Sequence, residues 1–288
     1  MRLLERAGTD APSEARAKAT AFRQLLVAII AVEAWDSFAR SVDAQDLLVP
    51  AAVAVLSTLG ASLAWSERWH RVGLAFIGTC VAVQVASAFP GTANHHYLEL
   101  VCVALLLLLR TSVDAEAQRL TVSLRLLLVV ALFQAGAQKV AWGYYFDGAF
   151  LSFAVSQSER FALLLEPLIP AAEFARLTAL SVADGAGPFR VSSLPFVVVS
   201  NVAYAAELVL PVLLLVPPVR KPAVVLVIAY FVSIEAAARE VFFGGIMVAL
   251  ALLFLPGSAL RRARPLYLLA LGYLLAMIFG LLPRWEFT

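Results

Sequence analysis

Long apolar runs alternate with short polar joins along nearly the whole chain. The runs lie at about 21–39, 47–65, 72–89, 95–110, 120–139, 194–216, 222–238, 241–255 and 266–283. A helix needs roughly 20 apolar residues to cross the hydrocarbon core of a bilayer. Proline and glycine mark the joins, as in FPGTANHH and LPGSALRRARP. The pattern predicts an all-α, polytopic membrane bundle of about nine spans. In the alternative, with about eight spans, the short seventh and eighth runs are re-entrant.

The composition agrees with lipid as the solvent. Hydrophobic residues make up 62% of the chain and charged residues 15%, and the mean hydropathy is +0.87. Soluble domains have about 45–50% apolar and about 25% charged residues. The composition therefore excludes an ordinary soluble protein and makes membrane lipid the expected partner. The net charge of +2 argues against a nucleic-acid partner.

The basic residues predict an orientation. Residues 1–20 lack the apolar core of a signal peptide, so we expect a cytosolic tail there and a single transmembrane domain over 21–288. By the positive-inside rule, Lys and Arg in the tail and in alternate joins place the amino terminus in the cytosol and the chain in the plasma membrane. These joins carry Arg68, Arg71, Arg110, Arg220, Lys221 and Arg261, among others. Lysine is rare and arginine frequent, which suggests a GC-rich bacterial genome.

The one long connection, residues 140–193, is apolar but interrupted by charges such as Glu159, Arg160 and Glu173. This pattern is typical of helices that lie in the membrane interface. On the predicted orientation the segment is outside, where it would roof a cavity open to a lipid-soluble substrate.

Several carboxyl groups fall within apolar runs, where an ionisable side chain needs a partner or a function. Glu33 and Asp36 share one face of the first run, and Lys139 is a candidate partner at the same depth. Glu207 and Glu235 are isolated, and an interhelical hydrogen bond explains each more simply than catalysis. A transporter would require these four carboxyls to face one another.

The fourth run opens with a dense polar cluster, Asn94-His95-His96-Tyr97-Leu98-Glu99. His95 and Glu99 are four residues apart and share a helix face. The simplest interpretation is an interfacial cap, with Asn94 at the helix start and the rings at headgroup depth. The spacing offers no third ligand, so no metal site is expected.

Lys139 ends the fifth run, on the same predicted side as His95. One interpretation is a snorkelling lysine beside an aromatic belt of Trp142, Tyr144 and Tyr145. The other is a desolvated amine that acts as a base and is held by an imidazole. The small residues Ala135-Gly136-Ala137 would permit the close helix packing that buries the amine.

Three motifs resemble the HTTM (horizontally transferred transmembrane) family, which shares its membrane domain with vitamin K-dependent gamma-carboxylase. They are Asn94-His95-x-Tyr97-Leu98, then Phe133-x-Ala135-Gly136-x-x-Lys139, and finally Glu207 before a proline-bearing run and the basic turn at Arg220. Together they extend over roughly residues 20–256. The chain differs from the family pattern at Trp142, which follows Lys139 by three residues where the carboxylase has a tryptophan at five.

The resemblance implies a helical HTTM-type fold, a reduced vitamin K-type quinone as cofactor, and carboxylase- or epoxidase-like chemistry. It implies Lys139 as the base and His95 as its partner, while Asn94, Tyr97, Gln138 and Trp142 are candidate substrate-binding residues. The large soluble domain of the animal carboxylase has no counterpart, so peptide carboxylation is not expected. The alternative is a non-catalytic membrane scaffold or a maturation partner for a secreted peptide.

Overall fold

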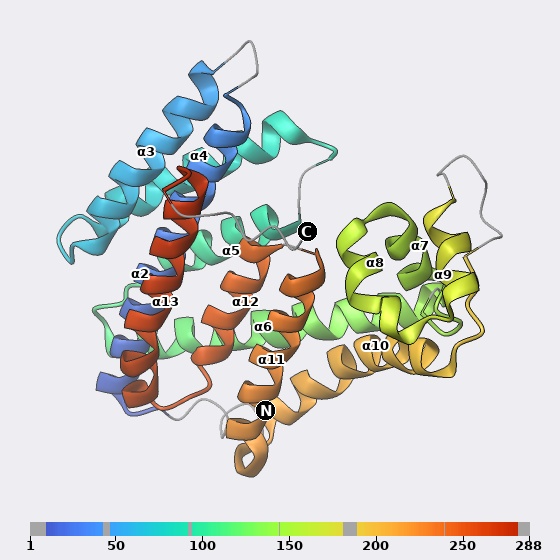
Figure 1. Cartoon of the computed structure of the whole chain (residues 1–288). Coiled ribbons are helices and arrows are strands. Elements are labelled where there is room, and N and C mark those ends of the chain that lie inside the picture. The colour runs from blue at the N-terminus through green and yellow to red at the C-terminus, as the bar shows by residue number, and fades with distance from the viewer. Residues whose placement is uncertain are drawn as a thin grey trace. The chain divides into compact units, whose positions relative to one another are not determined.

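The computed structural model describes residues 10–42, 47–91, 94–143, 145–180, 189–238 and 240–281. Within these ranges the chain is helical and contains no strand (Figure 1). It divides into two compact units. Unit 1 comprises Met1–Leu126 and Val241–Glu286, and unit 2 comprises Leu127–Glu240. The helix α6, Asp114–Trp142, begins in unit 1 and ends in unit 2.

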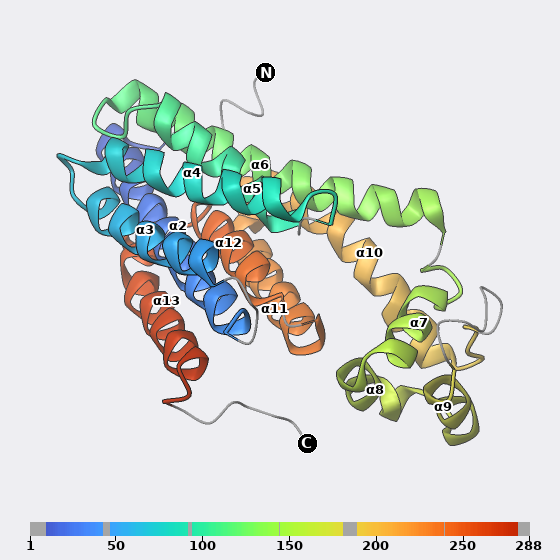
Figure 2. The ribbon, with the colours of Figure 1, turned by 90° about the horizontal axis from the view of Figure 1, so that it is seen from above.

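Unit 1 is a helical bundle around the first helix. Besides the start of α6, its helices are α2 (Pro12–Arg40), α3 (Leu48–Trp65), α4 (His70–Ala88), α5 (Asn94–Leu108), α12 (Val241–Leu252) and α13 (Gly257–Ile278). Helix α2 packs against α3, α12 and α13, and α4 packs between α3 and α5 (Figure 2). Glycines permit the closest crossing, since a Cβ at Gly60 would lie 2.9 Å from Ile77 and one at Gly73 would overlap the backbone of Ala64.

Unit 2 combines long and short helices. They are the end of α6, α7 (Ala149–Gln157), α8 (Glu159–Leu165), α9 (Ala171–Thr178), α10 (Leu194–Leu215) and α11 (Arg220–Ala238). The short helices enclose a small apolar core that contains Val155, Leu177 and Phe196. The described part of residues 145–180 thus forms short helices rather than a span, as the interrupted hydrophobic pattern predicts. Their position in a membrane interface stays a prediction.

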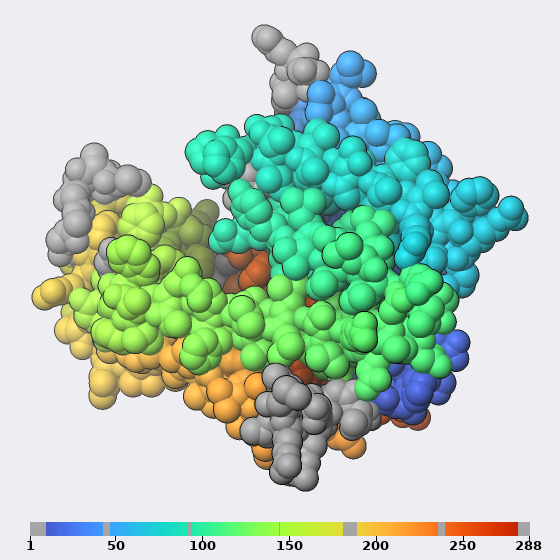
Figure 3. All heavy atoms as spheres, turned by 180° about the vertical axis from the view of Figure 1, so that it is seen from behind, coloured from blue at the N-terminus to red at the C-terminus, as the bar shows by residue number. Residues whose placement is uncertain are grey.

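Within the described residues, five helices are long and apolar enough to cross a membrane: Leu48–Trp65, His70–Ala88, Asp114–Trp142, Leu194–Leu215 and Pro217–Glu235. Most residues of each face outward. Val130 on α6, for example, is 61% exposed, and side chains of α6 lie open to view along the face in Figure 3. Apolar side chains in such numbers on the outside need lipid rather than water. The chain is therefore a helical membrane protein.

The predicted runs match nine of the described helices, but three of these helices begin at least six residues before their runs. Helix α2 begins at Pro12 rather than near residue 21, so residues 12–20 of the predicted tail are helical. Helices α6 and α13 begin at Asp114 and Gly257 rather than near residues 120 and 266. The apolar pattern missed these first turns because their charged residues lie outside the apolar runs.

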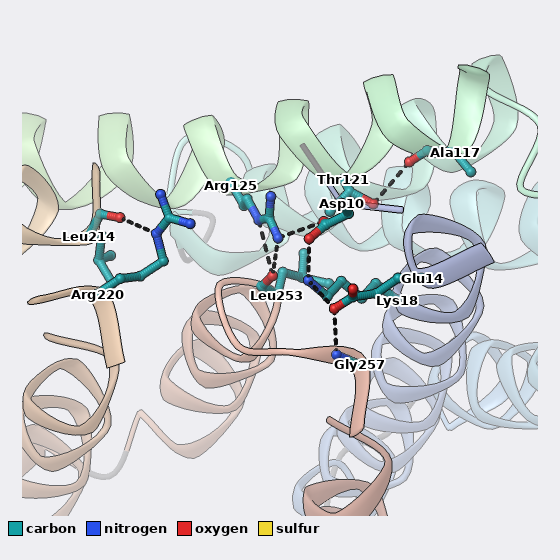
Figure 4. Close-up of polar contacts among 10 residues, drawn as sticks. All are labelled: Asp10, Glu14, Lys18, Ala117, Thr121, Arg125, Leu214, Arg220, Leu253 and Gly257. Carbon is teal, nitrogen blue, oxygen red and sulfur yellow. Dashed lines mark hydrogen bonds and ion pairs between the residues drawn. The ribbon is translucent and has the colours of Figure 1, made fainter. Parts of the chain in front are cut away.

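The buried start of α2 is held by ion pairs. Lys18 is almost fully buried and lies 2.7 Å from Asp10, which also pairs with Arg125 at 2.7 Å (Figure 4). Glu14 accepts a hydrogen bond from the backbone N–H of Gly257 at 2.7 Å. That hydrogen bond and the nearby Lys18 lower the pKa of Glu14 below its ordinary value, although partial burial opposes them. These contacts join α2 to α6 and α13 within unit 1.

Candidate functional site

In unit 2, Lys139 on α6 forms an ion pair with Glu207 on α10. The two helices approach closely one turn before the lysine, at Gly136. A Cβ at Gly136 would lie 2.9 Å from the Leu208 side chain and 3.0 Å from Glu207 Cβ. The small residue predicted to permit close packing therefore does so, and it brings the amine to a carboxylate.

Glu207 receives a second hydrogen bond from another helix. The Tyr230 hydroxyl on α11 donates to Glu207 Oε1 at 2.6 Å, and the same oxygen pairs with Lys139. The other oxygen, Oε2, is buried and accepts no hydrogen bond from any residue that the structure describes. Glu207 itself is only 4% exposed. One carboxylate oxygen thus accepts two hydrogen bonds, and the other accepts none from the described residues.

Tyr145 covers the amine from the loop after α6. Lys139 Nζ lies 5.2 Å from the centre of the Tyr145 ring, within range of a cation–π interaction. The ring is buried, so Tyr145 is not part of an aromatic belt facing lipid as one interpretation predicted. Burial and the nearby Glu207 raise the pKa of its phenol, which keeps the hydroxyl protonated. Tyr144 lies outside the described residues.

Unit 1 holds a separate cluster of two histidines and two carboxylates. His95 Nε2 lies 2.5 Å from Glu33 Oε1, and His96 Nδ1 lies 3.0 Å from Glu99 Oε2. His96 Nδ1 is also 3.7 Å from Glu33 Oε1, and the two imidazole rings have centroids 4.4 Å apart. Helix α2 supplies Glu33 and helix α5 supplies the other three. The base that Glu33 meets in unit 1 is therefore His95, while the predicted candidate Lys139 has a partner of its own in unit 2.

The remaining predicted residues lie at the surface of their own unit. Asn94 is the first residue of α5 and is exposed, and Tyr97 is 41% exposed. Gln138 is exposed and Trp142 is 68% exposed. These side chains lie outside the core of the bundle. A lipid-soluble ligand would therefore have to reach them from the bilayer.

Unit 1 also has a surface hollow of about 470 Å³, lined by Arg16, Glu67, Arg261 and Arg264 among others. It contains none of the predicted site residues. Its arginines belong to segments predicted to be cytosolic, and the hollow plays no part in the chemistry considered below.

Tyr230 is the one member of the lysine cluster that the sequence analysis did not single out. A phenol within an apolar run needs a hydrogen-bond partner, and that requirement could have indicated a polar contact at Tyr230. The sequence did not indicate that Glu207 pairs with Lys139, because Lys139 lies 68 residues earlier in the chain. The unit 2 cluster joins a carboxylate, an amine and a phenol by hydrogen bonds, and such groups can perform general acid–base chemistry.

No family model, no characterised protein and no solved structure shows a detectable match to this chain.

Proposed function

We propose that this chain is an HTTM-type membrane enzyme that takes a proton from the hydroxyl of a lipid-soluble quinol at Glu207 and Lys139. The observation that carries the proposal is the unshared oxygen of Glu207. A buried carboxylate oxygen without a hydrogen bond costs about 1–3 kcal/mol. That cost is recovered when a ligand hydroxyl donates to Glu207 Oε2.

The chemistry follows from the three side chains. The quinol O–H bond breaks as its proton passes to Glu207 Oε2, which leaves a quinolate and a neutral carboxylic acid. The ammonium of Lys139 then stabilises the new negative charge in an apolar setting, where such an interaction is strong. Tyr230 holds Glu207 by its other oxygen, so the carboxyl group is oriented before the ligand arrives.

In this proposal Glu207 is the base and Lys139 stabilises the charge on the quinolate, which modifies the role of base that the family resemblance gives to the lysine. The assistance of His95 to Lys139 stays a prediction, since the two belong to different units.

A reduced vitamin K-type quinone suits this cluster as the ligand. Its hydroxyl would donate the hydrogen bond that Glu207 Oε2 can accept, and its apolar ring and tail are soluble in the bilayer. When bound, the quinol would supply two electrons to dioxygen as oxidant. We propose that the site opens toward the outer leaflet of the plasma membrane, with the amino terminus in the cytosol, because basic residues gather on the tail side.

The test uses the full chain in nanodiscs with a reduced naphthoquinone, and measures quinol binding and oxygen uptake above the autoxidation rate. We expect Lys139→Ala and Glu207→Gln to lower uptake about 100-fold or more, the usual effect of losing a general base. Lys221→Ala is the matched control, because Lys221 is exposed at the start of α11.

Two results would overturn the proposal: no uptake with any of several quinols, or uptake that survives both substitutions. The scaffold alternative predicts a different outcome. There, maturation of a secreted peptide would be unaffected by Lys139→Ala and would depend on the short helices α7, α8 and α9.

A further inference from the structure

We infer that Glu33, His95, His96 and Glu99 form a binding site for a divalent first-row transition-metal ion. This site is in unit 1 and is independent of the proposed function at Glu207. One ligand atom from each of Glu33, His95 and His96 lies within 4.8 Å of the others. Sequence spacing concealed the site, since Glu33 is 62 residues from His95.

The separations suit a common ion. Four ligands at the zinc–nitrogen and zinc–oxygen distances of about 2.0–2.1 Å lie about 3.3 Å from one another in a tetrahedron. In unit 1 the donor atoms of His95 and Glu33 lie 2.5 Å apart, and those of His96 and Glu99 lie 3.0 Å apart. The donor atoms of His96 and Glu33 lie 3.7 Å apart. These separations lie on both sides of the value of about 3.3 Å expected for ligands of one tetrahedral ion.

Glu99 provides an independent indication of a ligand. Its side chain is 0% exposed, and its Oε1 accepts no hydrogen bond from the described residues. Its other oxygen already contacts His96. Two carboxyl groups side by side in a low-dielectric environment, Glu99 and Glu33, need either a shared proton or a positive charge between them. A divalent cation balances both carboxylates at once.

The donor set selects the class of metal. Two imidazole nitrogens and two carboxylate oxygens favour Zn²⁺, Fe²⁺ or Mn²⁺, whereas Mg²⁺ and Ca²⁺ prefer oxygen alone and Cu⁺ prefers sulfur. On binding, the ion displaces the hydrogen that His95 and Glu33 share, so that both become ligands. The resulting link between α2 and α5 would fix those two helices within unit 1.

The experiment measures zinc on the full chain, purified in detergent without a histidine tag. The protein is stripped with a chelator, exposed to Zn²⁺ and desalted, and bound metal is counted by mass spectrometry. We expect about one ion per chain in the wild type, and at least a tenfold loss of affinity in His95→Ala, His96→Ala and Glu33→Gln. His70→Ala is the matched control, because His70 is partly exposed and lies outside the cluster.

A wild-type chain that retains no zinc, or a His95→Ala chain that retains as much as the His70→Ala chain, would overturn the inference. If the cluster variants aggregate, the visible spectrum of Co²⁺ on the wild type decides. Bands of imidazole-ligated Co²⁺ support the site, and their absence refutes it. Quinol binding and oxygen uptake are not read in this experiment, so its failure is distinguishable from failure at Glu207.

Discussion

At the scale of single residues, two buried carboxyl groups on the apolar helices each contact a basic side chain on another helix. Lys139 meets Glu207 between α6 and α10, and Glu33 meets His95 between α2 and α5. In a medium without water, an unpaired charge costs several kcal/mol, so such pairs strongly constrain which helices lie together. A single substitution in such a pair is therefore expected to lower the stability of the protein most.

The Lys139–Glu207 pair makes a direct prediction about stability. Lys139→Met or Glu207→Gln alone leaves one buried charge without its partner, and each should destabilise the protein by about 3 kcal/mol. The double variant removes both charges and should recover most of that loss. The measurement is thermal unfolding of the purified protein in one detergent, with Lys221→Met as the control.

Equal and additive losses in the two single variants and the double variant would contradict this prediction, because additivity means that the two side chains do not interact. The stability cycle also separates two functions of the pair. A double variant that is stable but does not take up oxygen would show that the residues are needed for chemistry as well as for folding.

Sequence alone singled out polar residues on the apolar helices, but it did not indicate their contacts. Lys139, His95 and Glu207 stand out because each is polar within or beside an apolar run. Their partners are on helices distant in sequence, and hydrophobic periodicity carries no information about which helices are neighbours. The carboxylate that accompanies His95 therefore had to come from the structure.

At the scale of elements, glycine sets how closely α3 and α4 approach. A Cβ at Gly73 would overlap backbone atoms of Ala64 and Gly60, which have no freedom to rotate away. We expect Gly73→Ala to destabilise the protein by about 1–3 kcal/mol, the usual cost of overpacking. Gly272→Ala on α13 is the matched control, since a Cβ there meets nothing within 4 Å.

Thermal unfolding in detergent tests this prediction, and equal melting temperatures for the two alanine variants would refute the tight crossing. Because alanine has the higher helix propensity, Gly272→Ala should be neutral or slightly stabilising. Any loss specific to Gly73→Ala is then due to the α3–α4 contact.

Helix ends show which signals the apolar pattern lacks. The start of α2 is marked by Pro12, which is favoured in the first helical turn, and that of α6 by Asp114 and Glu116, whose charges suit a helix amino terminus. These signals were present in the sequence but lie outside the apolar runs. Apolar runs predict the lipid-exposed part of a helix, whereas polar residues determine how far it extends beyond.

At the scale of the whole molecule, the outward-facing apolar helices establish a membrane protein, and the distribution of basic residues predicts its orientation. Helix α12 has 12 residues, about 18 Å at the α-helical rise, and is too short to cross a bilayer of about 30 Å unaided. The span count near the carboxyl terminus therefore needs an experiment of its own. The amino-terminal half gives the clearer test, because α3 and α4 are both long enough to cross.

Two variants, each with one added cysteine, test the orientation. Arg68 and Gly91 are exposed, in the turns after α3 and after α4. With the amino terminus in the cytosol and α2, α3 and α4 all crossing, Arg68 is inside and Gly91 is outside. A membrane-impermeant maleimide should then label Gly91→Cys in intact cells and Arg68→Cys only after permeabilisation.

The native cysteines give this experiment a low background, because Cys80 and Cys102 are both free and buried. The unsubstituted chain is the control for their labelling. The reverse pattern would place the amino terminus outside, and labelling of both variants in intact cells would mean that α4 does not cross. Either result would also remove the basis for assigning the quinol site to the outer leaflet, since that assignment depends on the same distribution of Lys and Arg.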